Sequence, residues 1–165
     1  MVMRANKKGY TLTEMMIAVA ILGIVMGTAP AIFLQVQRFN RIYEAKNSIQ
    51  RDVRTSIDAI TRNLRQAYSS GVVIDSASGQ PPYSRISFQS VNGKTYSYYQ
   101  QGTNLFQTVD SATNRLSENL RYIAFTFPRS DDPHIISVSI TMEKATFEMR
   151  TKALQLSIEK VRIMN

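Results

Sequence analysis

A single carboxylate lies at the start of the longest uncharged stretch of the sequence. Glu14 is followed by residues 15–34, none of which is charged. A charged side chain in hydrocarbon costs roughly 2.5–3.5 kcal/mol on insertion scales, so it is expected to serve a function and to have a partner. The chemistry open to such a lone acid is ion pairing with a cation. The alternative is that Glu14 lies shallowly among lipid headgroups and needs no partner. Its spacing from Gly9 does not decide between the two.

Residues suited to catalysis or metal binding are sparse. The chain has one histidine, His134, next to a turn proline, and it has no cysteine. It therefore has no disulfide framework and no thiolate metal or redox site. Asp131 and Asp132 are too few for a calcium site without further ligands, and we interpret them as turn residues. The sequence also shows no glycine-rich phosphate-binding loop and no pattern that supports a Ser-His-Asp catalytic triad. We predict that the protein is not an enzyme and binds no cofactor, and we assign no residue to a metal site, although the sequence leaves open whether the β-rich part binds a metal.

The apolar stretch predicts the element that holds Glu14. As a helix, the twenty residues 15–34 span about 30 Å, which matches the hydrocarbon core of a bilayer. Arg4, Lys7 and Lys8 precede them, and basic residues stay cytoplasmic, so the rest of the chain is predicted to be exported. A cleaved secretory signal is the competing interpretation, but it has a shorter apolar core and a small-residue cleavage site, which residues 33–46 do not resemble. We predict a single-pass anchor in the inner (cytoplasmic) membrane.

The helix is predicted to continue beyond the span with a different character. After residue 34, most apolar side chains recur at three-, four- or seven-residue spacings, which is the period of one helix face. This stripe comprises Ile42, Ile49, Val53, Ile57, Ile60, Leu64, Ala67 and Tyr68. Residues 69–71, Ser-Ser-Gly, form a suitable helix stop. Thr11 to Tyr68 is therefore predicted as one helix with an apolar first half and an amphipathic second half.

The remainder of the chain predicts β-strands. Strand patterns occur at 85–90, 95–100, 103–109, 121–127, 135–142 and 153–161, with loops at 75–84 and 110–119. An Asn-Gly pair in residues 91–94 predicts a hairpin. The alternating apolar residues include Ile123, Phe125 and Phe127, then Ile136, Val138, Ile140 and Met142, and finally Leu154, Leu156 and Ile158. A half-buried antiparallel sheet fits this pattern, with its apolar face against the helix stripe. The fold class is α+β.

The net charge of +8 is unevenly distributed. Residues 35–70 hold seven Lys or Arg against three acids. The simplest interpretation is a solvated helix face, and the alternative is an anionic partner such as DNA or lipid headgroups. Strand tyrosines can stack on nucleic-acid bases, although they more often pack within a sheet. The candidate DNA-binding residues are Arg51, Arg54, Arg62, Arg65, Tyr96, Tyr98 and Tyr99.

Residues 7–27, KKGYTLTEMMIAVAILGIVMG, resemble the N-terminus of a type IV prepilin or pseudopilin. In that family a short basic leader ends in glycine. The mature chain then opens with an aromatic residue, Thr, Leu, any residue and Glu. The leader glycine is Gly9, and the next five positions are Tyr10, Thr11, Leu12, Thr13 and Glu14. The family usually has Phe where this chain has Tyr10. The resemblance is close over residues 7–34 and architectural beyond them.

The resemblance implies a processing event and a role for the lone acid. A prepilin peptidase/N-methyltransferase would cut between Gly9 and Tyr10 and methylate the new N-terminus on Tyr10. Glu14 of one subunit would pair with the Tyr10 amine of a neighbour, so that each offsets part of the other's desolvation cost and the axial register is fixed. The other implied partners are pilins or pseudopilins of the same filament, an inner-membrane assembly platform and membrane lipid.

The resemblance also implies a pilin-like architecture. The predicted regions are the leader (1–9), the transmembrane half of the helix (10–34), its amphipathic half (35–70) and a β-rich globular head (71–165). Residues 48–71 resemble the helix end of minor pseudopilins of the J type from type II secretion, which often carry Arg-Gln-Ala, as at residues 65–67. Minor pilins of type IV pili and competence systems look alike here. The absence of cysteine favours a minor or secretion-type subunit, because many major pilins close a C-terminal loop with a disulfide.

The predicted function is that of a minor pilin or pseudopilin, a structural subunit of a periplasm-spanning or extracellular filament. The alternatives are a competence-type minor pilin and a membrane-anchored DNA-binding module that never polymerises. The mature N-terminus distinguishes them. An N-methylated Tyr10 indicates the filament subunit, whereas a chain that retains residues 1–9 indicates a simple anchor.

Overall fold

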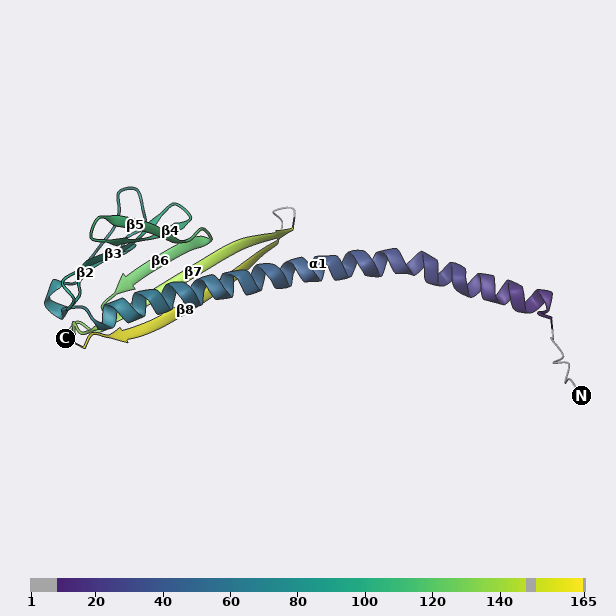
Figure 1. Cartoon of the computed structure of the whole chain (residues 1–165), viewed down its shortest axis with the longest axis horizontal. Helices are drawn as coiled ribbons and strands as arrows, with labels where there is room; N and C mark the ends of the chain where they lie inside the picture. The colour runs from purple at the N-terminus through teal and green to yellow at the C-terminus, as the bar shows by residue number, and fades with distance from the viewer. Residues whose placement is uncertain (1–8, 148–150, 165) are drawn as a thin grey trace, which may run out of the picture. The chain divides into compact units, whose positions relative to one another are not determined.

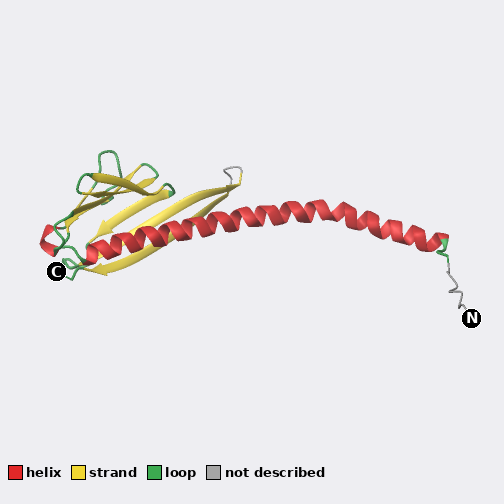
Figure 2. Ribbon diagram, viewed as in Figure 1, coloured by secondary structure: helices red, strands yellow, loops and turns green. Residues whose placement is uncertain are grey.

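The structure is a computed structural model that describes residues 9–147 and 151–164. Of the predicted leader, Gly9 lies within these residues, whereas Arg4, Lys7 and Lys8 lie outside them. The chain divides into two compact units, residues 1–40 and 41–165. Figure 1 labels α1 and the strands β2 to β8, and Figure 2 distinguishes helix, strand and loop.

One helix, α1 (Leu12–Arg65), belongs to both units. The prediction of a single continuous helix is confirmed, although α1 ends at Arg65 and not at Tyr68. The Tyr68 amide donates a hydrogen bond of 3.0 Å to the Gln89 carbonyl, which lies outside the helix, so Tyr68 does not continue the helical hydrogen-bond pattern. The short 3₁₀ turn η1 (Ser69–Gly71) follows.

Over residues 15–34, α1 is apolar on all sides. The side chains of residues 15–34 are exposed around the whole helix, and Pro30 lies inside it without ending it. A helix that is apolar all round needs lipid or other apolar helices as its surroundings. Among the described residues, α1 is the one helix long and apolar enough to cross a membrane, judged by length and composition.

The strands of the second unit form two antiparallel sheets, and the strands are adjacent in chain order within each sheet. The five-stranded sheet contains β1 (Val73–Asp75), β2 (Arg85–Gln89), β3 (Thr95–Gln101), β4 (Asn104–Val109) and β5 (Ala112–Ser117). The three-stranded sheet contains β6 (Leu120–Thr126), β7 (Ile135–Phe147) and β8 (Thr151–Arg162). The Ile123 amide donates to the Gln100 side chain at 3.2 Å, which joins the two sheets.

The predicted strands at β2, β3, β4, β6, β7 and β8 are confirmed, as is the hairpin between β2 and β3. Residues 110–119 were wrongly predicted as a loop, because they contain β5. Most β5 side chains are exposed, so the strand lacks the apolar alternation by which sequence reveals a strand. Its backbone pairing with β4, with Thr113 opposite Thr108, defines it instead. The short strand β1 was also missed.

The amphipathic half of α1 packs on the sheets and forms the core with them. The buried part of the predicted stripe is Ile49, Val53, Ile57, Ile60 and Leu64 in α1 and Ala67 just beyond it, whereas Tyr68 is exposed. The facing strand residues Ile123, Phe125, Ile136, Val138, Ile140 and Met142 are fully buried. The predicted α+β, pilin-like class is therefore confirmed, with one long N-terminal helix packed on an antiparallel β head. The term head is used below for residues 71–164.

The last strand departs from the prediction. The apolar alternation of Leu154, Leu156 and Ile158 is real, but these side chains are exposed. In the register of β7 and β8, Leu156 lies opposite Thr141, on the face of the sheet away from the core. Phe127 is also exposed, since β6 ends at Thr126 and the buried row of that strand does not continue.

Candidate functional site

The start of α1 gives Glu14 a set of partners within its own chain. The Glu14 amide donates to the Thr11 hydroxyl at 3.3 Å, and Glu14 Oε2 accepts from the Thr11 amide at 2.9 Å. The Thr11 hydroxyl also lies 3.0 Å from Glu14 Oε2. This reciprocal pair is a capping box, which satisfies two backbone donors that a helix start leaves without intrahelical partners.

This capping box was not predicted, although its Thr-x-x-Glu signal is present in residues 11–14. The same four residues carry the resemblance to prepilins, so one short motif holds both signals. The bonds use the amides of Thr11 and Glu14, both of which lie after the predicted cleavage point. The capping box is therefore compatible with a chain that begins at Tyr10.

Gly9 and Tyr10 precede the helix in exposed, irregular backbone. A Cβ added at Gly9 would have no heavy atom within 4 Å. The space at Gly9 within this chain therefore does not itself require a glycine. A requirement for glycine at position 9 would therefore have to arise from contact with another protein. Gly9, Tyr10 and Glu14 lie within one short segment at the start of the apolar span.

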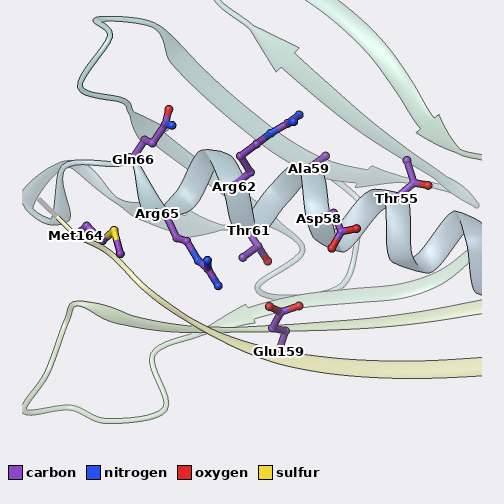
Figure 3. Close-up of a pocket in the computed structure, with 9 residues that line it drawn as sticks. All are labelled: Thr55, Asp58, Ala59, Thr61, Arg62, Arg65, Gln66, Glu159 and Met164. Carbon is purple, nitrogen blue, oxygen red and sulfur yellow. The ribbon is translucent and has the colours of Figure 1, made fainter.

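The four arginines proposed for DNA belong to α1 and line two hollows, which share Thr55 and Asp58. A cleft of about 870 Å³ lies beside the end of α1 (Figure 3). It is lined by Thr55, Asp58, Ala59, Thr61, Arg62, Arg65, Gln66, Glu159 and Met164. A second hollow includes Arg51, Arg54 and Asp58. In Figure 3, Arg65 and Glu159 extend into the space between helix and strand, whereas Arg62 points away from Glu159.

The first cleft presents both signs of charge. Asp58 and Glu159 share its lining with Arg62 and Arg65. Binding to a nucleic-acid backbone depends on neutralising several phosphates with cations, and carboxylates in the same cleft oppose this. The mixed charges of the cleft therefore give the DNA alternative no support. The hydroxyl of Thr61, which also lines the cleft, is buried without a hydrogen-bond partner in the described residues.

The tyrosine cluster of β3 is part of the packing of the head. The ring of Tyr96 stacks on Phe88 with centroids 5.7 Å apart, and the ring of Tyr99 stacks on Phe106 at 5.6 Å. Tyr98 is completely buried, and burial raises the pKa of its hydroxyl to about 12. Rings used in this way present no free stacking platform of the kind that binds single-stranded nucleic acid.

The acidic pair at residues 131–132 makes turn contacts, as predicted. The guanidinium of Arg129 pairs with Asp131 at 3.1 Å, and Asp132 accepts a hydrogen bond of 3.0 Å from the His134 amide. Across residues 9–147 and 151–164, no group of three or more His, Cys, Asp or Glu side chains is placed to hold a metal ion.

Comparison with known proteins identifies the N-terminal segment. Residues 4–30 match the family described as the prokaryotic N-terminal methylation motif. No curated protein matches the chain. The motif marks structural proteins of the pilin type, and it supports a type IV prepilin-like family for this chain. With the single apolar N-terminal helix, it fits a membrane-anchored pilin or pseudopilin subunit. Such a motif implies processing by a peptidase and assembly with other pilins.

Proposed function

We propose that this protein is a minor pilin or pseudopilin, a structural subunit of a filament of type II secretion or type IV pilus machinery. The match to the methylation motif over residues 4–30 is the observation that carries the proposal. The mature chain begins at Tyr10, which is N-methylated, after cleavage behind Gly9. The protein is a single-pass inner-membrane protein before assembly, with its head in the periplasm or outside the cell.

Glu14 has two roles in this proposal. Within its own chain it completes the capping box with Thr11. During assembly it pairs with the Tyr10 amine of a neighbouring subunit. One carboxylate can serve both, because an ionised carboxylate offers about four acceptor positions. The capping box also holds the carboxylate at the helix start, so less side-chain freedom is lost when the amine arrives.

A J-type minor pseudopilin of type II secretion is the subclass we favour, because residues 48–71 resemble that helix end and the chain has no cysteine. A competence-type minor pilin is the second candidate. The partners are the prepilin peptidase/N-methyltransferase, the other pilins or pseudopilins of the filament, the inner-membrane assembly platform and membrane lipid. The DNA-binding module is set aside because the arginine cleft mixes charges and the tyrosines are engaged in packing.

The mature N-terminus tests this proposal. The protein would be purified from membranes, and its N-terminal peptide analysed by mass spectrometry. We expect a peptide that begins at Tyr10 and carries one additional methyl group. A chain that retains residues 1–9 would contradict the proposal. A chain cleaved elsewhere would contradict the assignment of Gly9.

A further inference from the structure

An exposed apolar row runs along β8. Leu154, Leu156 and Ile158 are 53%, 55% and 61% exposed, although the strand belongs to the head. Across the sheet they lie opposite Glu143, Thr141 and Ser139 of β7. The row is therefore flanked on the β7 side by polar side chains. Three large apolar side chains at alternate positions of one strand form a continuous strip, unlike the scattered exposed apolar residues of ordinary surfaces.

The same strand has an open edge. β8 is the last strand of its sheet and pairs with β7 alone. It is 12 residues long, and within the described residues no second strand pairs with its other side. A long, apolar, unpaired edge invites pairing with another chain, and proteins normally protect such an edge by shortening, bending or charging it. Residues 154–158 carry no charge and no proline, and the register of β7 and β8 is regular along them.

Cations gather at the C-terminal end of this edge. Lys160 and Arg162 continue the exposed row, and neither forms an ion pair within the described residues. Lys152, at the other end of the row, differs because it pairs with Glu143. Arg65 lies near the C-terminal end, since its carbonyl accepts a 3.2 Å hydrogen bond from the Met164 amide. Along the exposed row the uncompensated charge is therefore positive and confined to one end, whereas Glu159 lies on the other face of β8, in the cleft with Arg65.

We propose that β8 is a docking edge for an extended segment of a different protein chain, which adds to the sheet as an antiparallel strand. The segment carries alternating apolar residues opposite Leu154, Leu156 and Ile158. It carries acidic residues opposite Lys160 and Arg162, at its own N-terminal end. Strand addition supplies the backbone hydrogen bonds that the edge lacks, and the side-chain row determines the register. This proposal does not depend on the filament role.

A second copy of this chain fits the edge poorly. An antiparallel pairing that aligns the apolar row with itself places Lys152 opposite Lys160. A parallel pairing in register places Lys160 beside Lys160 and Arg162 beside Arg162. Like charges directly opposite one another destabilise a sheet. A lipid surface fits poorly too, because an unpaired strand edge in hydrocarbon leaves its amides and carbonyls without partners.

A designed peptide tests the proposal on the full chain in detergent micelles. The probe is Asp-Thr-Glu-Thr-Val-Thr-Val-Thr-Val, labelled for fluorescence anisotropy. Antiparallel to β8, its acids lie opposite Arg162 and Lys160, and its valines lie opposite the apolar row. One control peptide has lysines in place of both acids. A second control has the acidic sequence with alternate backbone nitrogens methylated, which removes donors while leaving every side chain in place.

We expect the acidic peptide to bind and the lysine peptide to bind roughly tenfold or more weakly, since like charges across an interface are strongly disfavoured. In the double variant Lys160→Glu and Arg162→Glu, the preference should reverse. Binding of the lysine peptide by this variant also demonstrates that it is folded. Lys94→Glu, which makes the same charge change in the turn between β2 and β3, should leave the preference of the native chain unaltered.

Hydrogen exchange measured by mass spectrometry shows where the peptide binds. It also tests whether a second copy of the chain or a lipid surface covers β8 instead. The acidic peptide should protect β8 amides, and its backbone-methylated form should not. The proposal is overturned if neither peptide binds, if binding ignores the charge reversal, or if the methylated peptide protects equally. Two further outcomes overturn it. One is protection of the β8 amides without peptide in a sample that sedimentation shows to be self-associated, and the other is protection of these amides without peptide when the protein is moved from detergent into anionic lipid nanodiscs.

Discussion

The Nδ2 group of Asn63 in α1 donates a hydrogen bond of 2.7 Å to the hydroxyl of Tyr98 in β3. The same hydroxyl lies 3.3 Å from the Ala59 carbonyl and accepts from Gln107 at 3.1 Å. A residue on the amphipathic half of the helix is thus bonded to the centre of the five-stranded sheet. Because Tyr98 is fully buried, its hydroxyl requires these partners, and they fix the position of the helix on the sheet.

Tyr98 should make the stability of the protein fall at high pH. Burial raises its pKa to about 12, from an ordinary value of 10.0. The folded state therefore keeps a proton that the unfolded state loses between these values, and the contribution present below pH 10 declines as the pH rises toward 12. The decline is about 1.4 kcal/mol per pH unit.

Tyr98→Phe isolates this effect from the other tyrosines and lysines. The free energy of unfolding of the full chain in detergent would be measured from pH 8 to 12. The variant should be less stable at pH 8 by roughly 1–3 kcal/mol, because Asn63 and Gln107 lose their partner. Its slope at high pH should be shallower than that of the parent. Parallel curves would show that Tyr98 does not retain its proton.

The stripe of α1 should tolerate no charge. Ile57 is buried, so Ile57→Asp places an unpaired carboxylate in the core and should cost at least about 3 kcal/mol of stability. Gln50→Asp introduces the same residue on the exposed side of α1 and serves as the matched control. Thermal unfolding of both variants in detergent provides the comparison. Equal melting temperatures would mean that the stripe does not pack on the head.

Three variants should separate the two roles of Glu14. Glu14→Gln keeps a capping-box acceptor but removes the charge, whereas Thr11→Ala removes the hydroxyl half of the box and keeps the charge. Glu14→Ala removes the charge and the carboxylate half of the box. If Glu14 pairs with the Tyr10 amine of a neighbour, both Glu14 variants should be cleaved and inserted but recover fewer partner subunits by crosslinking. Thr11→Ala should assemble better than either.

The comparison requires equal amounts of mature protein in the membrane. Full assembly of Glu14→Gln together with failure of Thr11→Ala would assign the residue to the helix start alone. Full assembly of all three variants would mean that Glu14 lies among the headgroups and has no partner in a neighbouring subunit.

Gly9 should be required by the processing enzyme and not by the fold. Gly9→Leu should leave uncleaved precursor in the membrane fraction, since a side chain at position 9 meets nothing within this chain and should not disturb its fold. Gly27→Leu introduces the same side chain at another open position and should mature normally. Immunoblotting distinguishes precursor from mature protein. Maturation of Gly9→Leu at the parental rate would place the cleavage site elsewhere.

Glu143 should contribute stability that is lost in acid. Hydrogen bonds from Lys152 and then from Arg121 hold the pKa of Glu143 below its ordinary value of 4.5. The stabilisation is therefore present above that ordinary value and disappears as the pH falls through the lowered folded pKa. Glu143→Gln should reduce the loss of stability between pH 6 and pH 3, measured by thermal unfolding. An unaltered acid profile would mean that these pairs are not maintained in solution.

Most of the fold and part of the site were accessible from sequence, because short-range patterns encode them. Residues 15–34 determine an apolar helix by composition, and the stripe from Ile49 to Leu64 determines by its period which side of α1 is buried. The Asn-Gly turn fixed one hairpin. The proximity of Gly9, Tyr10 and Glu14 needed no tertiary structure, since the three lie within six consecutive residues.

Tertiary structure alone decided which face of β8 is buried. Leu154, Leu156 and Ile158 alternate like core residues, but alternation specifies two faces without saying which one meets the helix. The pairing of Leu156 with Thr141 settles this, because directly paired residues share a face and the neighbouring residues Ile140 and Met142 already face the core. The sequence thus determined the helix and its anchor, whereas long-range register decided which apolar residues remain exposed at the edge.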